Sequence, residues 1–465
     1  MHTLFTLPEV LAQVAVHLTR EEATIPSRVS RAFQQAFGPI IWRACSIGLA
    51  GQQPSPQGLI RNAHNIRKLS YNDVFSLDYL SLPCTQLTSL KVCRVSGLDS
   101  DTKWHHLAEL VKQNKHLHDL HISDRSRSAT LEFWSSLAFC HSLRIVDIQG
   151  AHMDQEQFAA LWNDCKGIQL LKCHHIRVDN AITATQQCTL VPHPTLKELS
   201  FANFANFQVL KLCPNLQAIS WYNNEFDCDI LLEELAVLLQ GGQLMQLGSL
   251  SMSYAKDQDL SRCLKFMHRI KKVSSHHGNI GPLSFHAMSR KFGMLEHLYI
   301  PYDSTMPGEM ILSILESCPQ LVYFQATKVS STEVIKSKPW VAANLKALHL
   351  GITIDSFDQE TIRLQSRSVF ARLSKLTRLT QLTLHGPYEI GNDDEQGLDL
   401  RLESGLDQLA TIKDLTFLDF DHTFQNMSDA DVAWMVENWK ELVDVFGTCN
   451  SHGEFHEQPC FYEDE

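Results

Sequence analysis

Apolar residues recur along most of this chain in the pattern L-x-x-L-x-L, and Leu196-Lys-Glu-Leu199-Ser-Phe201 is the clearest copy. A strand repeats every two residues, so the fourth and sixth positions of each copy fall on one side of a short strand. Each copy therefore predicts a strand with one buried face. Fourteen copies occur between residues 66 and 420, with first positions at Ile66, Leu87, Leu117, Leu143, Ile168, Leu196, Leu216, Leu247, Ile270, Leu295, Leu321, Leu345, Leu379 and Leu415.

The segments between these strands predict helices. Residues 229–239 and 308–317 show the i, i+3, i+4 apolar spacing of a helix packed on one side. The mean spacing between copies is about 27 residues, within the range of leucine-rich repeats. One strand and one helix per repeat predict an irregular α/β solenoid over residues 66–447, because each repeat can bury its apolar face only against its neighbours. An ordinary α/β domain with leucine-rich strands is the alternative.

Residues 1–48 do not carry the repeat and predict a separate three-helix domain. Thr6 with Glu9 forms one capping box, ahead of a helix ending near residue 18, and Thr19 with Glu22 forms a second. Phe33 and its apolar neighbours line the next helix. A proline at position 39 predicts the start of a short third helix ending near residue 42. Residues 49–65, which are rich in Gly, Pro and Gln, predict a linker and first cap.

Length, charge and cysteine content limit the class of protein. A chain of 465 residues is too long for one compact core, whereas a solenoid grows by adding repeats. The formal net charge of -12 argues against partners such as nucleic acid or an anionic membrane. No apolar run reaches the roughly 20 residues of a membrane helix, and the N-terminus lacks the basic start of a signal peptide.

The cysteines predict a reducing compartment. Thirteen is an odd number, and four of them lie three residues ahead of the first apolar position of a copy: Cys140, Cys165, Cys213 and Cys318. A cysteine at a fixed place in the repeat indicates a small buried side chain rather than a disulfide. The expected location is therefore the cytoplasm or nucleus.

The face of the predicted sheet opposite the helices is a candidate binding surface. The residues between the fourth and sixth positions, with their neighbours, are polar, mixed in charge and include many His and Tyr. Such side chains suit a protein interface, whereas a groove for phosphate would need many Lys and Arg. A solvated face without a partner is the alternative. The candidate substrate-binding residues are His121, Tyr222, His297, Tyr299, Tyr323 and His349.

The N-terminal domain resembles a known motif. The segments 7–11 (LPEVL), 29–33 (VSRAF) and 39–43 (PIIWR), together with Leu18, follow the F-box in order and spacing. Nearly the whole chain resembles the fungal F-box/leucine-rich-repeat proteins. In that family the F-box docks on the Skp adaptor of a cullin-RING (SCF-type) ubiquitin ligase, and the repeats hold a protein substrate. The resemblance implies a non-catalytic substrate receptor with adaptor-binding residues Leu7, Pro8, Val10, Leu11, Leu18, Val29 and Trp42.

A second hypothesis is a leucine-rich-repeat scaffold or inhibitor that does not join a ligase. In it the N-terminal helices only cover the first repeat. The second helix of the motif favours it, because Ala23 and Thr24 stand where the family usually has two leucines, and Pro26 and Arg28 follow.

No catalytic or cofactor motif is present in the sequence. We find no phosphate-binding glycine loop, no H-E-x-x-H and no G-x-S-x-G. The polar, acidic tail at residues 448–465 contains the spacing of a zinc site at Cys449, His452, His456 and Cys460. The expectation is nevertheless no metal, because the segment is short and terminal. Two long polar intervals, at 353–368 and 385–404, predict loops that either carry recognition or are simply solvated.

Overall fold

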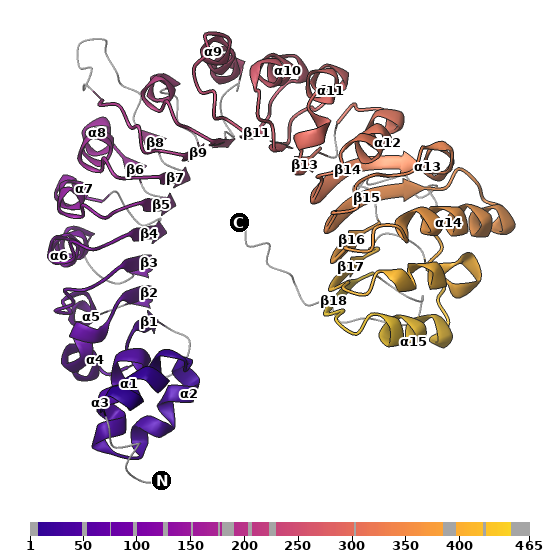
Figure 1. Ribbon diagram of the computed structural model, residues 1–465. Coiled ribbons are helices and arrows are strands. Elements are labelled where there is room, and N and C mark those ends of the chain that lie inside the picture. The colour runs from indigo at the N-terminus through magenta and orange to yellow at the C-terminus, as the bar shows by residue number, and fades with distance from the viewer. Residues whose placement is uncertain are drawn as a thin grey trace. The chain divides into compact units, whose positions relative to one another are not determined.

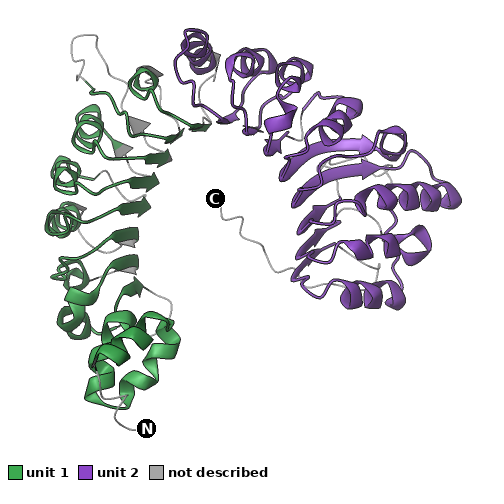
Figure 2. Ribbon diagram, viewed as in Figure 1, with its two compact units in different colours: residues 1–225 green, residues 226–465 purple. Residues whose placement is uncertain are grey.

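The computed structural model describes residues 8–48, 54–74, 76–95, 100–123, 129–149, 152–174, 177–178, 190–202, 207–222, 229–301, 304–384, 397–421 and 425–447. The chain forms two compact units, Met1–Glu225 and Phe226–Glu465 (Figure 2). Each unit contains a parallel sheet of short strands with helices along one side (Figure 1). This is the α/β leucine-rich-repeat solenoid that the apolar pattern predicts.

The first unit opens with a small helical domain. Its elements are α1 (Pro8–Val16), α2 (Arg20–Thr24), the 3-10 helix η2 (Pro26–Arg28) and α3 (Arg31–Ile41). The capping box of Thr19 and Glu22 at α2 is confirmed, since the Thr19 side chain accepts from the Glu22 amide and the Glu22 carboxylate accepts from the Thr19 amide. These helices form their own core around Leu11, Ala15, Ala23 and Phe37.

The expected third helix starting at Pro39 is wrong. Ser30 caps α3, which runs on through Pro39 to Ile41 as one helix. Pro39 removes one helical hydrogen bond and crowds the carbonyl four residues earlier, and α3 ends only two residues after it, at Ile41. By contrast, Pro26 occupies the first position of η2, where its missing N–H is not needed.

The sheet of the first unit starts earlier than the pattern predicts. Strand β1 (Ala44–Gly48) pairs in parallel with β2 (Lys68–Val74), and its Cys45 and Ile47 are buried. Trp42, Cys45 and Ile47 therefore form a degenerate copy of the repeat at the end of the helical domain. The range expected to be a linker also contains a helix, α4 (Pro56–Asn62), and a 3-10 helix, η3 (Ala63–Asn65).

The other strands of this sheet follow the predicted copies, and all of them pair in parallel. Their apolar residues point to the helices and are almost completely buried. The remaining elements of the first unit are α5 (Leu77–Leu80), β3 (Ser89–Val95), α6 (Ser100–Gln113), β4 (Asp119–Ser123), α7 (Leu131–Ser136), η4 (Leu137–Phe139), β5 (Ile145–Gln149), β6 (His152–Met153), α8 (Gln155–Asp164), β7 (Leu170–His174), β8 (Arg177–Val178), β9 (Glu198–Ala202), η5 (Phe207–Leu212) and β10 (Ala218–Tyr222).

The second unit has the same plan, with eight parallel strands from β11 to β18. The predicted helices at 229–239 and 308–317 are confirmed as α9 and α12. The elements are α9 (Asp229–Gln240), β11 (Ser249–Ser253), α10 (Asp257–Phe266), β12 (Lys272–His276), α11 (Pro282–Ser289), η6 (Phe292–Met294), β13 (His297–Tyr299), α12 (Gly308–Ser317), β14 (Tyr323–Ser330), α13 (Ser331–Lys336), β15 (Ala347–Thr353), α14 (Gln359–Leu373), β16 (Gln381–Thr383), η7 (Leu402–Ser404), η8 (Leu406–Thr411), β17 (Phe417–Asp419), α15 (Asp429–Asn438) and β18 (Asp444–Phe446).

One expected loop in this unit is wrong. Much of the polar interval at 353–368 belongs to α14, the longest helix in the described part of the chain. Asp358 caps it, and Ile362, Val369, Phe370 and Leu373 form its buried side. In the second polar interval, residues 385–396 lie outside the described residues, and η7 contains residues 402–404.

The column three residues ahead of each copy is a buried structural position throughout both units. Cys140, Cys165, Cys213 and Cys318 occupy it as predicted, and all four are buried. Burial raises the pKa of the Cys140, Cys213 and Cys318 thiols to about 12, so they stay protonated. None of the nine cysteines in the described part forms a disulfide. Two polar residues, Asn114 and His193, take the same position and are fully enclosed.

Candidate protein-binding surfaces

The second unit presents two rows of side chains on the face of its sheet turned away from the helices, called here the sheet face. Parallel pairing without a shift in register places equivalent residues side by side along the sheet. The first row holds the opening residue of each strand, and the central row holds the residue two positions later. The first row is Ser249, Lys272, His297, Tyr323, Ala347, Gln381, Phe417 and Asp444, and the central row is Ser251, Ser274, Tyr299, Gln325, His349, Thr383, Asp419 and Phe446.

Aromatic and histidine rings pair across neighbouring strands of these rows. His297 and Tyr323 are stacked with ring centroids 6.2 Å apart, and Tyr323 lies 5.4 Å from His349. His276, at the end of β12, lies 4.6 Å from Tyr299. These separations fall in the range of favourable ring contacts, about 4.5–7 Å. We call these five residues the ring cluster.

Hydrogen bonds fix the edges of three of these rings. The Tyr323 hydroxyl donates to Gln325 Oε1 at 2.6 Å, and His349 Nδ1 lies 2.9 Å from the Thr383 hydroxyl. His276 Nε2 lies 3.0 Å from the Ser274 hydroxyl. The rings are therefore held in place before any partner arrives, which reduces the entropy lost on binding.

The ring cluster carries no fixed positive charge of its own. Burial lowers the pKa of His297 from its ordinary value, and the nearby Lys272 lowers it further, although Glu296 opposes the shift. His297 is therefore neutral at pH 7. Lys272 is the one cation in the two rows, and it lies on β12 at the edge of the cluster.

Two rings beside the cluster occupy unusual backbone conformations. Tyr254 and His277 each directly follow a strand, with φ angles of 57° and 49°. Their rings stack at 5.5 Å. The left-handed region is unfavourable for bulky residues and is often retained next to binding sites. The sequence pattern does not predict these left-handed conformations, because both residues lie just beyond the apolar positions of the repeat.

The sheet face of the first unit is different in character. Its central row carries charged residues of both signs, with Lys91, His121, Asp147 and Lys172 on successive strands of the sheet. His121 Nδ1 lies 3.4 Å from Asp147 Oδ2, in a partly exposed pair. Tyr222 ends β10, four strands along the sheet from the strand that carries His121.

The structure thus brings four of the six predicted substrate-binding residues together. His297, Tyr299, Tyr323 and His349 form one cluster on three neighbouring strands. His121 and Tyr222 belong to the first unit and are separated from each other by β5, β7 and β9. His276, the fifth member of the ring cluster, and Gln325, which accepts from the Tyr323 hydroxyl, were not among the six.

Five of the seven predicted adaptor-binding residues fall into three groups by their exposure. Leu11 is only 1% exposed and lies in the core of the helical domain, with Leu18 packed against it, so both support the surface rather than form it. Val10 and Trp42 are half-buried, and Trp42 heads the first, degenerate repeat. Val29 is 70% exposed. Leu7 lies outside the described residues, and Pro8 begins α1.

Among its described residues, the helical domain carries four large, exposed apolar side chains, one of which is Val29. Ile25 is 75% exposed, and Val16 and Val14 are also exposed. Ile25 immediately precedes η2 and Val29 immediately follows it, so the 3-10 turn spaces them on one short segment. Two exposed apolar residues on one short turn, Ile25 and Val29, are a feature typical of a protein-binding surface.

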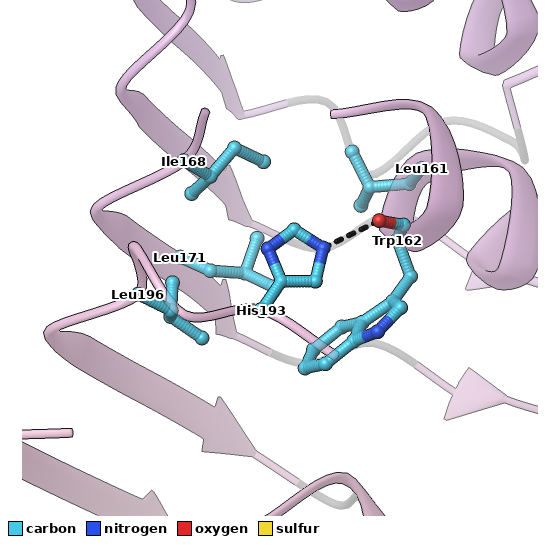
Figure 3. Close-up of a pocket in the computed structure, with 6 residues that line it drawn as sticks. All are labelled: Leu161, Trp162, Ile168, Leu171, His193 and Leu196. Carbon is cyan, nitrogen blue, oxygen red and sulfur yellow. Dashed lines mark hydrogen bonds between the residues drawn. The ribbon is translucent and has the colours of Figure 1, made fainter. Parts of the chain in front are cut away.

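A small apolar pocket in the first unit surrounds His193 (Figure 3). Leu161, Ile168, Leu171 and Leu196 line it with Trp162, and it has no room for a water-sized sphere. His193 Nε2 lies 2.5 Å from the Trp162 carbonyl oxygen, while its Nδ1 is buried without a hydrogen-bond partner. The pocket is therefore a packing feature and not a ligand site. His193 is neutral in it, with the proton on Nε2.

We expect His193 to make the first unit less stable at acidic pH. Burial lowers the pKa of His193, opposed by the hydrogen bond to Trp162 and assisted by Lys166. The folded form therefore binds its proton at a lower pH than the unfolded chain, so stability is complete above pH about 6.5 and falls as the pH drops below it. The slope approaches about 1.4 kcal/mol per pH unit until His193 protonates in the folded state. Urea unfolding between pH 7.5 and 5.5 measures this.

The matched control for this measurement is His193→Cys, which restores the residue found in the neighbouring repeats. The variant should lose the part of the pH dependence due to His193, while the other histidines contribute equally to both proteins. Identical pH dependence in the two proteins would contradict the assignment.

The described residues contain neither a candidate metal site nor a candidate membrane-spanning helix. They contain no group of three or more His, Cys, Asp or Glu that could hold a metal ion. No helix among them has the length and apolarity to cross a membrane. The zinc-like spacing of the tail lies outside the described residues, so it stays a sequence observation.

Comparison with known proteins gives limited similarity. No model of a known protein family matches the sequence, and no curated protein does. Among solved structures, an internalin from Listeria monocytogenes is 13% identical with a TM-score of 0.36, covering 90% of this chain and 95% of that chain. The Rad7–Elc1 complex of yeast is 12% identical with a TM-score of 0.46, covering 97% of this chain and 91% of that chain. At this level neither structure informs the function.

Proposed function

We propose that this chain is a non-catalytic recognition subunit that binds a protein substrate through the sheet face of its second unit. The observation that carries the proposal is the ring cluster, in which Tyr and His rings are held by mutual contacts and hydrogen bonds. Rigid aromatic residues supply most of the energy at protein interfaces. The pocket around His193, which has no room for a small molecule, does not favour an enzyme.

We further propose that the helical domain docks on a Skp-family adaptor, and through it on a cullin, as an SCF-type ubiquitin ligase. The order of the F-box segments in the sequence supports this, as do the exposed Ile25 and Val29 around η2. The receptor would hold its substrate close to the ubiquitin-transfer machinery and accelerate transfer by proximity. Its compartment would be the cytoplasm or nucleus.

Co-purification of the full chain with a Skp-family adaptor tests the ligase proposal. Removal of residues 1–48 would also remove β1 and expose the edge of β2, so surface substitutions are the cleaner comparison. The double variant Ile25→Asp with Val29→Asp should weaken adaptor binding about tenfold, because it places two charges in an apolar interface. Isothermal titration calorimetry measures the change in affinity.

Val436→Asp is the matched control, since Val436 is also 70% exposed but lies on α15 of the second unit. It should leave adaptor affinity unchanged. Failure of the folded full-length chain to bind any Skp-family adaptor would overturn the ligase proposal. The helical domain would then serve as a cap, and the function would be that of a protein-binding scaffold.

A further inference from the structure

The sheet face of the second unit carries rings between β13 and β18, together with two carboxylates on β17 and β18. These six strands contribute twelve residues to the first and central rows, and the structure describes all twelve. None of them is Lys or Arg, two are Asp, and six carry a His, Tyr or Phe ring. This composition is unlike the mixed charge of the first unit, where Lys91 and Lys172 lie in the central row.

The carboxylates and rings alternate at the C-terminal strands. Phe417 lies beside Asp444, and Asp419 lies beside Phe446, in the register of β17 and β18. The two phenylalanine rings have centroids 5.4 Å apart. Asp421 follows β17, and its backbone amide donates to the Asp419 carboxylate at 3.0 Å. Carboxylates next to ring faces provide the two kinds of contact that a guanidinium group makes.

Among the described residues, two lysines lie at the margins of this surface. Lys272 lies on β12, one strand before the twelve positions. Lys328 lies beyond a shift in register near the end of β14, outside the two rows. An acidic or phosphorylated segment would therefore find few partners along β13–β18, whereas a basic segment would meet carboxylates at β17 and β18 and ring faces on β13, β14 and β15.

We infer that the sheet face of β13–β18 recognises an arginine-rich segment of its protein partner. Arginine side chains stack on the rings of the ring cluster and of Phe417 and Phe446, and pair with Asp419 and Asp444. The inference rests on the proposed function, in that it takes the same sheet face as the recognition surface and adds the chemistry of the substrate. Arginine suits it better than lysine because its planar group both stacks on rings and forms forked pairs with carboxylates.

Fluorescence anisotropy with labelled peptides tests this on the full-length chain. The probes are a peptide of eight arginines spaced by glycine and the same peptide with citrulline, lysine or glutamate in place of arginine. Citrulline preserves the shape of arginine and removes its charge. At pH 7.4 and physiological salt the arginine peptide should bind at least about tenfold more tightly than the citrulline peptide, and more tightly than the lysine peptide.

Substitutions on the surface locate the binding. Tyr323→Leu should weaken binding of the arginine peptide about fivefold, through loss of a ring. Asp444→Asn should weaken it about threefold, through loss of one exposed ion pair. Asp407→Asn is the charge-matched control, because Asp407 is exposed on η8, among the helices, and should change nothing. Asp444 is exposed as well, so Asp444→Asn should leave the fold intact. This variant therefore tests the surface even if Tyr323→Leu lowers the unfolding temperature.

Several results would overturn the inference. Equal binding of the citrulline peptide, tighter binding of the glutamate peptide, or equal loss with Asp407→Asn and Asp444→Asn would each do so, as would no binding at millimolar peptide. The adaptor experiment uses residues of the helical domain, so the two failures are distinguishable. A chain that binds the adaptor but ignores the arginine peptide rejects this inference and leaves the ligase proposal standing.

Discussion

Replacing Asn114 with alanine should lower the free energy of unfolding of the first unit by about 4 kcal/mol. The Asn114 side chain is 1% exposed and makes three hydrogen bonds to backbone groups. Its Oδ1 accepts from the Leu87 amide at 2.7 Å, and its Nδ2 donates to the carbonyl oxygens of Cys84 and Leu110 at 2.7 and 2.6 Å. Alanine would leave all three groups buried without a partner, which is the most destabilising way to lose a hydrogen bond.

Cys140→Ala is the matched control for this substitution. Cys140 occupies the equivalent position one repeat later, where its thiol contacts the carbonyl oxygens of Val111 and Asn114 at 3.7 and 3.6 Å. A thiol is a weak donor, so its loss should lower the free energy of unfolding by only about 1 kcal/mol. Urea unfolding followed by tryptophan fluorescence, with hydrogen exchange to localise the change, measures both. Similar losses for Asn114→Ala and Cys140→Ala would show that the hydrogen bonds of Asn114 contribute little.

The strands could be predicted from the sequence because each one buries a face with the same spacing of apolar residues. The positions Leu298, Phe324 and Leu348 lie opposite one another in the sheet, as their places in the repeat require. Strand β1 was missed because Trp42 and Cys45 stand where most other copies have aliphatic residues, and because Trp42 also completes the F-box pattern. Large side chains can take a leucine position at the end of a solenoid, where one neighbouring repeat is absent.

Helix α14 was missed for a different reason. Ending the polar interval at residue 368 separated Ile362 from Val369, Phe370 and Leu373, although these residues together form one buried side. The capping residue Asp358 was present in the sequence, but the polar first turns concealed the periodicity. Many helices begin with charged residues. Such a helix is easily mistaken for a loop when its polar first half is considered without the apolar residues that follow.

The candidate surface could be predicted only in part. The repeat places His297, Tyr299, Tyr323 and His349 on one face, but the partner of each ring depends on register and rotamer. His297 stacks on Tyr323 because both open their strands, whereas His276 reaches Tyr299 from the end of the preceding strand. The left-handed conformations of Tyr254 and His277 have no counterpart in sequence pattern, since Gly or Asn would ordinarily be expected there.

Replacing Asp257 with alanine should lower the free energy of unfolding of the second unit by about 3 kcal/mol. Asp257 opens α10, yet its carboxylate caps the next helix, α11, whose own N-cap residue Gly281 offers no side chain. It accepts from the amides of Gly281, Leu283 and Ser284 at 2.9, 3.0 and 2.8 Å. Negative charge at the start of a helix adds to these hydrogen bonds.

The effect should reach the ring cluster, because α11 lies in the segment between β12, which carries His276, and β13, which carries His297 and Tyr299. Local opening of this repeat would release the rings from their fixed positions, so substrate affinity should fall along with stability. Asp257→Asn retains an acceptor oxygen and should lose only about 1 kcal/mol, which makes it the graded control. Hydrogen exchange at residues 272–299 measures the local opening. Equal protection in wild type and Asp257→Ala would mean that packing, rather than this cap, holds α11 in place, and the predicted coupling between the cap and the binding surface would be rejected.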